Sequence, residues 1–225
     1  MDATPTFQQA VRIHKSVLAA AEKRLLIRIA ERLPRFVNSE HLTALGAFGM
    51  LGMALCFWQG HAALAAVIPL LALNWFGDSL DGTLARVRRL ERPRYGYYVD
   101  HVLDVLGFAF LMGGLVLGNH MSAIVGLGFL AAYYLLMIEI ALATHARGAF
   151  RMSFFHMGPT ELRILLAAGV VQLFRSEVVT LFGHHYRLFD VGGVAGIAFL
   201  FFTFIFSAVR NGSALFVEER IDQIG

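Results

Sequence analysis

The sequence predicts an all-α polytopic membrane protein, with six transmembrane helices and an amphipathic N-terminal helix that lies on the membrane surface. Hydrophobic residues make up 57% of its 225 residues, and charged residues only 16%. A soluble domain averages about a quarter charged residues, so the composition favours a single compact membrane protein. The apolar residues also gather into six runs, most of them near the length of roughly 20 residues that a spanning helix needs.

The basic N-terminal segment, residues 1–37, is predicted to form the interfacial helix. Lysines and arginines outnumber acids in it, and it lacks the apolar core of a signal peptide. Four of its apolar residues share one helical stripe, which suits a membrane surface: Val11, Leu18, Leu25 and Ile29. Lys15 and Glu22 interrupt this stripe, so a solvated helix resting on the protein's own loops is an equal alternative. Residues 38–225 form the predicted membrane domain.

Six runs are predicted to span the membrane, at residues 41–58, 62–86, 97–117, 121–144, 160–174 and 191–209. The fifth run is short, and an extension of it to residue 182 is also considered. Pro69 is predicted to kink the second helix and Pro159 to begin the fifth, because proline has no amide hydrogen to donate inside a helix.

The basic residues of the loops orient these helices. Arginines are frequent between the second and third runs and occur between the fourth and fifth, whereas the turns at 59–61 and 119–120 have neither lysine nor arginine. Loops rich in these residues stay in the cytoplasm. Both termini and the second-to-third loop are therefore predicted to be cytoplasmic, in a bacterial inner membrane. The basic residues lie where anionic lipid headgroups are found, so membrane lipids are expected partners and nucleic acid is not.

Four aspartates stand at the adjoining ends of the second and third runs: Asp78, Asp81, Asp100 and Asp104. Acids at membrane depth are costly and persist only when they are paired or bind a cation. The two runs contain no matching set of lysines or arginines. The sequence therefore predicts that a metal ion supplies the counter-charge. Carboxylate oxygens are hard ligands, which suit Mg²⁺, Mn²⁺ or Ca²⁺ rather than zinc.

Small residues accompany these acids on the same helix faces. Residues three or four apart share a face, and the two faces carry Asp78, Asp81, Gly82 and Ala85, and Gly96, Asp100 and Asp104. Antiparallel packing of the two helices through their short loop would bring the four carboxylates together. The small residues leave room for a ligand, and Arg86 is placed to bind an anionic group such as phosphate. This combination is typical of phosphoryl transfer; a divalent metal transporter using the same acids is the alternative.

The spacing of these residues resembles the signature of a known family. From Asp78 to Asp104 the chain reads Asp-x2-Asp-Gly-x2-Ala-Arg-x9-Gly-x3-Asp-x3-Asp, which is similar to the motif of the CDP-alcohol phosphotransferases, also called CDP-alcohol phosphatidyltransferases. These are integral membrane enzymes of phospholipid synthesis. The resemblance implies a homodimer of six-helix protomers, a CDP-linked donor, two divalent cations, and transfer to an alcohol with release of CMP.

Matched position by position, the resemblance gives each residue of the motif a role. The acids are implied to be the metal ligands: Asp78, Asp81, Asp100 and Asp104. The small residues are implied to make space for the nucleotide: Gly82, Ala85 and Gly96. Asp104 is alternatively the base that acts on the acceptor hydroxyl, and Arg86 is implied to help hold the phosphates.

Two further residues favour one branch of the family. His101 directly follows Asp100, and this pair is similar to the choline/ethanolamine phosphotransferases; Glu161 resembles a Thr-Glu of the same branch. A histidine polarised by a glutamate would be a suitable base for a lipid hydroxyl. This branch implies a small CDP-alcohol donor and a diacylglycerol-like acceptor. The alternative is a CDP-diacylglycerol donor with a soluble polyol, polyol phosphate or amino acid as the acceptor. Equally, His101 is explained by an interfacial position, and Glu161 by the dipole of a helix start.

Other polar or small residues within the runs carry lesser predictions. Asn74, one turn before Asp78, is predicted to contact the nucleotide or to cap its pocket. Glu139 in the fourth run has to find a polar partner inside the bundle. The glycine pairs four residues apart are interpreted as close helix contacts: Gly114 with Gly118, and Gly192 with Gly196.

Overall fold

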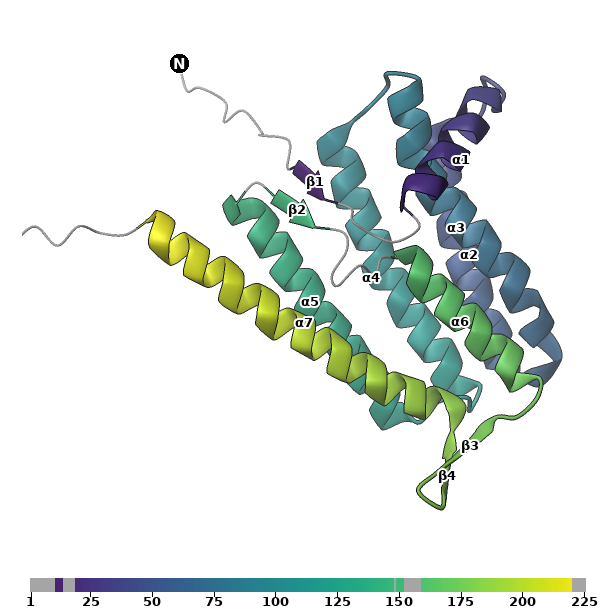
Figure 1. Cartoon of the computed structure of the whole chain (residues 1–225). Coiled ribbons are helices and arrows are strands. Elements are labelled where there is room, and N and C mark those ends of the chain that lie inside the picture. Colours follow the sequence, from purple (N-terminus) through teal and green to yellow (C-terminus); the bar gives the residue numbers. More distant parts are fainter. Residues whose placement is uncertain (1–10, 14–18, 148, 152–158, 220–225) are drawn as a thin grey trace, which may run out of the picture.

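The computed structural model describes residues 11–13, 19–147, 149–151 and 159–219, and most of them lie in helices. The helices are α1 (Ala19–Arg32), α2 (Ser39–Gln59), the short 3₁₀ helix η1 (His61–Ala63), α3 (Leu64–Val87), α4 (Pro93–Leu117), α5 (Ala123–Arg147), α6 (Pro159–Leu173) and α7 (Leu188–Glu218). β1 (Val11–Ile13) pairs in parallel with β2 (Ala149–Arg151), and β3 (Val178–Leu181) pairs antiparallel with β4 (His184–Arg187). Figure 1 shows α1 at one end of the bundle and the β3–β4 hairpin at the other.

Five helical segments are long and apolar enough to cross a membrane: Ser39–Gln59, His61–Val87, Pro93–Leu117, Ala123–Ala146 and Leu188–Glu218. This confirms the predicted membrane-type α fold. The predicted fifth span is the helix α6, which Pro159 begins, but it has only 15 residues. At 1.5 Å per residue it is about 22 Å long, short of the roughly 30 Å of a hydrocarbon core. Its extension to residue 182 is wrong, because residues 178–181 form β3.

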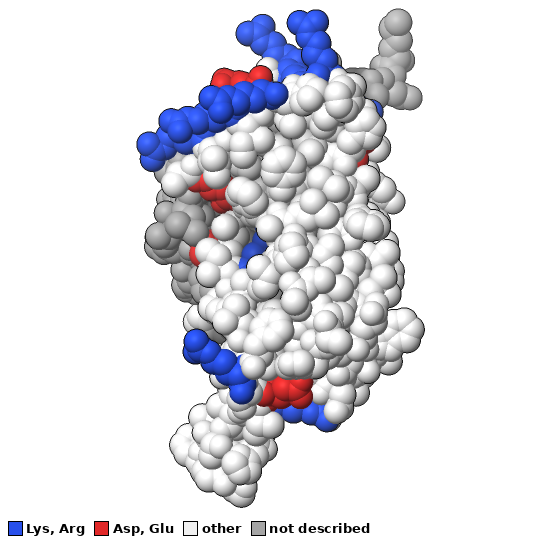
Figure 2. All heavy atoms as spheres, turned by 90° about the vertical axis from the view of Figure 1, so that its right-hand side faces the viewer, with Lys and Arg blue, Asp and Glu red and all other residues white. Residues whose placement is uncertain are grey.

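The charged residues on one face of the protein are distributed as expected for helices that cross a membrane. Figure 2 shows one face that is uncharged over most of its area, with Lys and Arg gathered at the α1 end and a few more at the opposite end, and with small charged patches along one edge. A largely uncharged surface between charged ends is typical of a polytopic membrane protein.

The helix α1 is shorter than predicted and turns a different face to the bundle. Val11 lies in the strand β1, so the predicted stripe does not continue through it, and Lys15 and Leu18 lie outside the described residues. Leu25, a stripe residue, is 47% exposed, whereas Leu26 and Ala30 are buried. They pack with Leu80 of α3. Through this face α1 packs on the helix α3, whereas the alternative considered for it was contact with the loops.

Packing around α2 determines where the neighbouring helices lie. Gly46 of α2 lies against Gly77 of α3, so a Cβ on Gly77 would collide with the backbone of Gly46, and Gly49 of α2 lies close to the backbone of Asn74. On the other side of α2, a Cβ on Gly114 of α4 would collide with the carbonyl of Ala54, and one on Gly118 with the carbonyl of Phe57. The prediction of close contacts at Gly114 and Gly118 is therefore confirmed.

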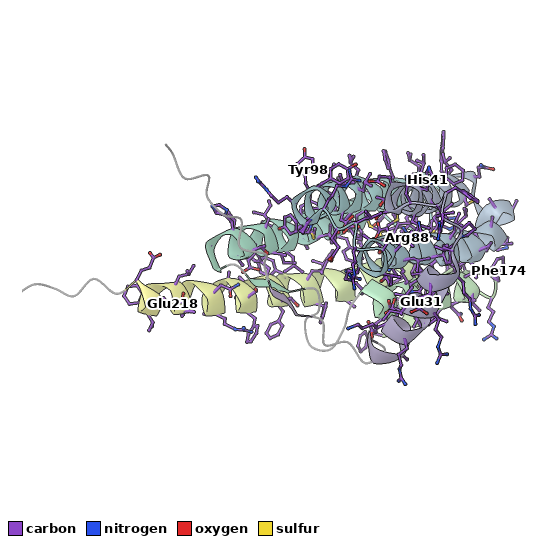
Figure 3. All side chains as sticks on the ribbon, turned by 90° about the horizontal axis from the view of Figure 1, so that it is seen from above. Glu31, His41, Arg88, Tyr98, Phe174 and Glu218 are labelled. Carbon is purple, nitrogen blue, oxygen red and sulfur yellow. The ribbon has the colours of Figure 1, made fainter. Side chains whose placement is uncertain are left out.

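The helices α5 and α7 form a pair of their own. They pack on each other through Leu136 and Leu200, and Figure 3 shows α7 running away from the other helices toward Glu218. Glu139 of α5 accepts hydrogen bonds from the Ser207 hydroxyl at 2.8 Å and the Asn211 amide at 2.7 Å. Glu139 therefore has the polar partners inside the bundle that the sequence required.

The connection between α3 and α4 is hydrogen-bonded to the turn between α1 and α2. Arg88 donates to the carbonyl oxygens of Leu33 at 3.0 Å and Pro34 at 2.9 Å. Arg92 forms an ion pair with Glu40 of α2. These contacts fix the loop that joins the two aspartate-bearing helices.

Candidate active site

The four predicted aspartates border one small cavity. Its volume is about 30 Å³, and its lining residues come from α2, α3 and α4: Thr43, Gly46, Ala47, Met50, Asn74, Asp78, Asp81, Asp100, Leu103 and Asp104. The Asp104 carboxyl lies within electrostatic range of the other three aspartates. Spacings of three and four residues on two helices have thus brought all four carboxylates to one place, as the sequence indicated.

The helix α2 is what brings α3 and α4 together at the site. In the ranges that the structure describes, α3 and α4 make few direct contacts, and each packs on α2 instead. The expectation of direct antiparallel packing was wrong. It failed because the glycines on both sides of α2 let that helix, rather than α4, approach α3 closely. The site is therefore three-sided, with α2 as its third wall.

The first turns of α2 hold Asp81. Its carboxylate accepts a hydrogen bond from the Thr43 hydroxyl at 2.6 Å, and its carbonyl accepts one from the Ser39 hydroxyl at 2.9 Å. Asp81 is only 6% exposed. A carboxylate so buried needs such partners, because desolvation penalises an uncompensated charge.

Asp78 has a cationic partner that the sequence did not reveal. Arg163 of α6 donates through Nη2 to Asp78 Oδ2 and through Nε to Asn74 Oδ1 at 3.0 Å. Asn74 is buried and donates in turn to the Gly46 carbonyl at 2.9 Å. This counter-charge comes from a third helix rather than from the two aspartate-bearing helices. The available signal was that Arg163 is the one lysine or arginine within the predicted fifth span.

The donor set fits divalent cations in chemistry, although the carboxylates face protein partners. Among the residues that the structure describes, no three His, Cys, Asp or Glu side chains already form a metal-binding group. Two of the four aspartates show why no such group forms, because Asp78 is turned to Arg163 and Asp81 to Thr43. Four carboxylates around a cavity of about 30 Å³ nevertheless provide hard oxygen ligands and room for one or two water-sized groups. Rotation of the carboxylates into the cavity would complete the fit.

A much larger cavity, of about 3100 Å³, opens beside the aspartates. Its polar end includes the residues predicted to bind the nucleotide: Gly82, Ala85, Arg86 and Gly96. A Cβ on Gly96 would meet no atom within 4 Å, so this position leaves the space that was predicted for it. Arg86 donates to the Thr83 hydroxyl at 3.0 Å. The rest of the wall is largely apolar and comes mainly from α2, α4, α5, α6 and α7.

The two branch-specific residues occupy different positions. His101 borders the large cavity, packs against the tilted Tyr97 ring with ring centroids 4.0 Å apart, and places Nδ1 2.8 Å from the Tyr97 carbonyl oxygen. Glu161 and Arg163 lie two residues apart on α6, which is about 200° around a helix. Since Arg163 faces Asp78, Glu161 faces away from that carboxylate. The pairing of His101 with Glu161 stays a prediction.

A glutamate of α1 also reaches the edge of the site. Glu22 accepts hydrogen bonds from the Trp75 indole at 2.8 Å and the Ser79 hydroxyl at 3.3 Å. It also accepts one from the Thr160 hydroxyl of α6 at 2.9 Å. The sequence showed Glu22 only as an interruption of an apolar stripe, but it connects α1 to α3 and α6.

The fold and site together define a class of protein: an integral membrane protein of long apolar helices, with acids from two of them around one cavity and a large, mostly apolar chamber beside it. The model of the CDP-alcohol phosphatidyltransferase family matches residues 36–209, and the chain belongs to this family. The match includes α2 to α6 and most of α7, with all four aspartates. The protein is therefore a transferase of phospholipid synthesis that acts on a CDP-alcohol. A comparison with curated proteins gives no match.

Proposed function

We propose that the protein transfers a substituted phosphate group from a small CDP-alcohol, of the ethanolamine or choline type, to a diacylglycerol-like acceptor and releases CMP. Family membership supports the CDP-linked donor. The proposal of a lipid substrate rests on the chamber of about 3100 Å³, whose polar end contains the aspartates and whose remaining wall is largely apolar. Small-molecule sites are typically about 300–1,000 Å³, so this chamber has room for a lipid as well as a nucleotide.

The four aspartates would hold two divalent cations, Mg²⁺ or Mn²⁺. When bound, these ions neutralise the charge that develops on the diphosphate as the bond to phosphorus breaks. Arg86 binds the phosphates from the chamber side, and Gly96 leaves room for the nucleotide. Asn74 fixes the α2–α3 contact and the Arg163 side chain, and so shapes the pocket floor.

The acceptor hydroxyl would lose its proton to Asp104, or to His101 with the support of Glu161. The alkoxide oxygen then attacks the β-phosphorus. A new oxygen–phosphorus bond forms, the bond from that phosphorus to the bridging oxygen breaks, and CMP leaves with the electron pair. Both candidate bases, Asp104 and His101, border the large chamber, where a lipid hydroxyl can reach them.

The loop charges support a proposal for the placement of the protein in the cell. We propose a bacterial inner-membrane protein with both termini and the site facing the cytoplasm, because the α1 end carries the gathered lysines and arginines (Figure 2). A homodimer, with membrane lipids around it, is part of the same proposal and rests on the family resemblance.

The runner-up function uses CDP-diacylglycerol as the donor and a soluble polyol, polyol phosphate or amino acid as the acceptor. The apolar chamber supports it as well, because in that reaction the donor is the lipid. Arg163 beside Asp78 gives it specific support, since an extra cation in the site suits an anionic acceptor.

A panel of substrates separates these functions. Purified protein in lipid receives either CDP-ethanolamine or CDP-choline with diacylglycerol, or CDP-diacylglycerol with soluble alcohols, and CMP release is measured. We expect release with the first set only, and loss of it in Asp100→Asn but not in Asp190→Asn, an aspartate at the hairpin end that accepts from the Ser122 amide. Release with the second set only establishes the runner-up. Divalent-cation uptake by proteoliposomes without any nucleotide turnover would establish a transporter instead.

A further inference from the structure

Arg163 is a partly buried cation that contacts Asp78 from outside the two helices that carry the aspartates. Its side chain is 16% exposed, and that of Asp78 is 36% exposed. Its Nη2 and Nε atoms donate to Asp78 and Asn74, which are one turn apart on α3. Because Asn74 is itself anchored to the Gly46 carbonyl, the planar guanidinium is oriented on Asp78 rather than merely near it.

The same carboxylate borders the small cavity that the four aspartates line. A divalent cation in that cavity and the guanidinium would therefore share one carboxylate as their partner. Both are positive, and at membrane depth their repulsion is weakly screened. A carboxylate turned to the guanidinium also has to rotate before its oxygens point into the cavity. Binding of the cation and retention of the ion pair thus oppose each other.

We propose that Arg163 is a positioning residue that competes with a divalent cation for Asp78. Arg163 neutralises Asp78 until a cation binds there, and cation binding releases the guanidinium into the large chamber, which Arg163 also borders. This inference rests on the proposed function, because it takes the four aspartates as the cation site. By linkage, a group that must be displaced before a ligand binds weakens the binding of that ligand.

The neighbouring contacts make Arg163 a residue that can be replaced without undocking α6. Thr160, one turn earlier on α6, is held by Glu22 of α1. The start of α6 therefore keeps a polar anchor when the Arg163 contacts are removed.

The test measures cation binding in the absence of any substrate. Mg²⁺, and in parallel Mn²⁺, is titrated into the purified protein in lipid nanodiscs, and the thermal unfolding midpoint is followed for wild type, Arg163→Gln and Arg163→Lys. We expect the half-saturating cation concentration to fall about tenfold in Arg163→Gln, within the usual range of coupling between two sites. The half-saturating concentration for Arg163→Lys should lie between those of wild type and Arg163→Gln, because one ammonium group cannot make both of the contacts that the guanidinium makes. Arg175→Gln, an exposed arginine just after α6, is the matched control and should not change it.

Each other outcome overturns the inference. An unchanged or higher half-saturating concentration in Arg163→Gln would mean that Arg163 does not compete with the cation. If Arg163→Gln does not fold, Arg163→Lys is compared with wild type instead. An unchanged or higher half-saturating concentration in Arg163→Lys would then overturn the inference. A wild-type protein whose unfolding midpoint does not respond to either cation would overturn the proposed metal site as well, and this distinguishes the two failures.

Discussion

Thr160 at the start of α6 donates a hydrogen bond of 2.9 Å to Glu22 on α1, across 138 residues of sequence. Because Glu22 also accepts from Trp75 and Ser79 of α3, one carboxylate joins three helices at the edge of the site. Arg163, which contacts Asp78, is one turn further along α6. The N-terminal helix therefore supports the position of a residue in the aspartate site.

Glu22→Ala should destabilise the protein, because three donors lose their common acceptor. Hydrogen bonds to a charged group contribute about 1.5–3 kcal/mol each, and Glu22 is partly exposed, so we expect a total loss of about 1–3 kcal/mol. Thermal unfolding in one detergent measures it, with Glu31→Ala, an exposed acid of the same helix, as the control. Equal unfolding midpoints for the two variants would show that the Glu22 contacts contribute nothing.

Alanine substitutions at two adjacent glycines of α4 should have different effects on stability. A Cβ on Gly114 would collide with the Ala54 carbonyl of α2, whereas a Cβ on Gly113 would meet no atom within 4 Å. Gly114→Ala should therefore push α4 away from α2 and lower both the unfolding midpoint and activity. Gly113→Ala should be neutral or stabilising by up to about 1 kcal/mol, because alanine is the better helix former. Similar behaviour of the two variants would contradict the close α2–α4 contact.

Glu139 should matter for the α5–α7 pair rather than for chemistry. It accepts from Ser207 and Asn211 and does not border either described cavity. We expect Glu139→Ala to cost about 1–2 kcal/mol, and Glu139→Gln less, since its amide oxygen still accepts. Unfolding curves give the loss, and CMP release per folded molecule should stay near wild type. Activity lost without any loss of stability would place Glu139 in the reaction instead.

His120, at the hairpin end, should make stability sensitive to acid. Burial lowers the pKa of its imidazole, and this outweighs the nearby Glu177 carboxylate, which raises it; His61 and Arg187 also face it and lower it. The unfolded state, with a histidine pKa near about 6.5, then takes up the proton first. As pH falls below about 7, the folded state is therefore destabilised, and above that range the effect is absent.

The check is the slope of the unfolding midpoint between pH 7.5 and 5.5 (roughly the range of histidine titration). His120→Asn should flatten this slope, whereas His184→Asn, in the exposed β4 strand, should leave it as in wild type. A steeper slope in His120→Asn would mean that protonation of His120 favours the folded state.

The long apolar runs and the aspartate cluster could be predicted because both are local patterns. Apolar runs of spanning length identify helices, and spacings of three and four residues put acids on one face. Close contacts at Gly114 and Gly118 followed from their small size and spacing. These features depend on residues near one another in sequence.

What the sequence did not reveal depends on contacts between distant segments. Arg163 and Asp78 are 85 residues apart, and no spacing rule joins them. The position of α2 between α3 and α4 depends on glycines of three helices fitting together, which no single helix records. The apolar stripe of α1 was drawn too long, because Val11 pairs with β2 instead of continuing a helix.

The central claim is that the four aspartates hold divalent cations for transfer from a CDP-linked donor. CMP release by the purified protein in lipid, measured before chelation, in chelator and after Mg²⁺ is restored, tests it most directly. We expect chelator to abolish release, Mg²⁺ to restore it, and Asp81→Asn to reduce it by at least about a hundredfold while Asp190→Asn does not. CMP release that continues undiminished in chelator would contradict the account.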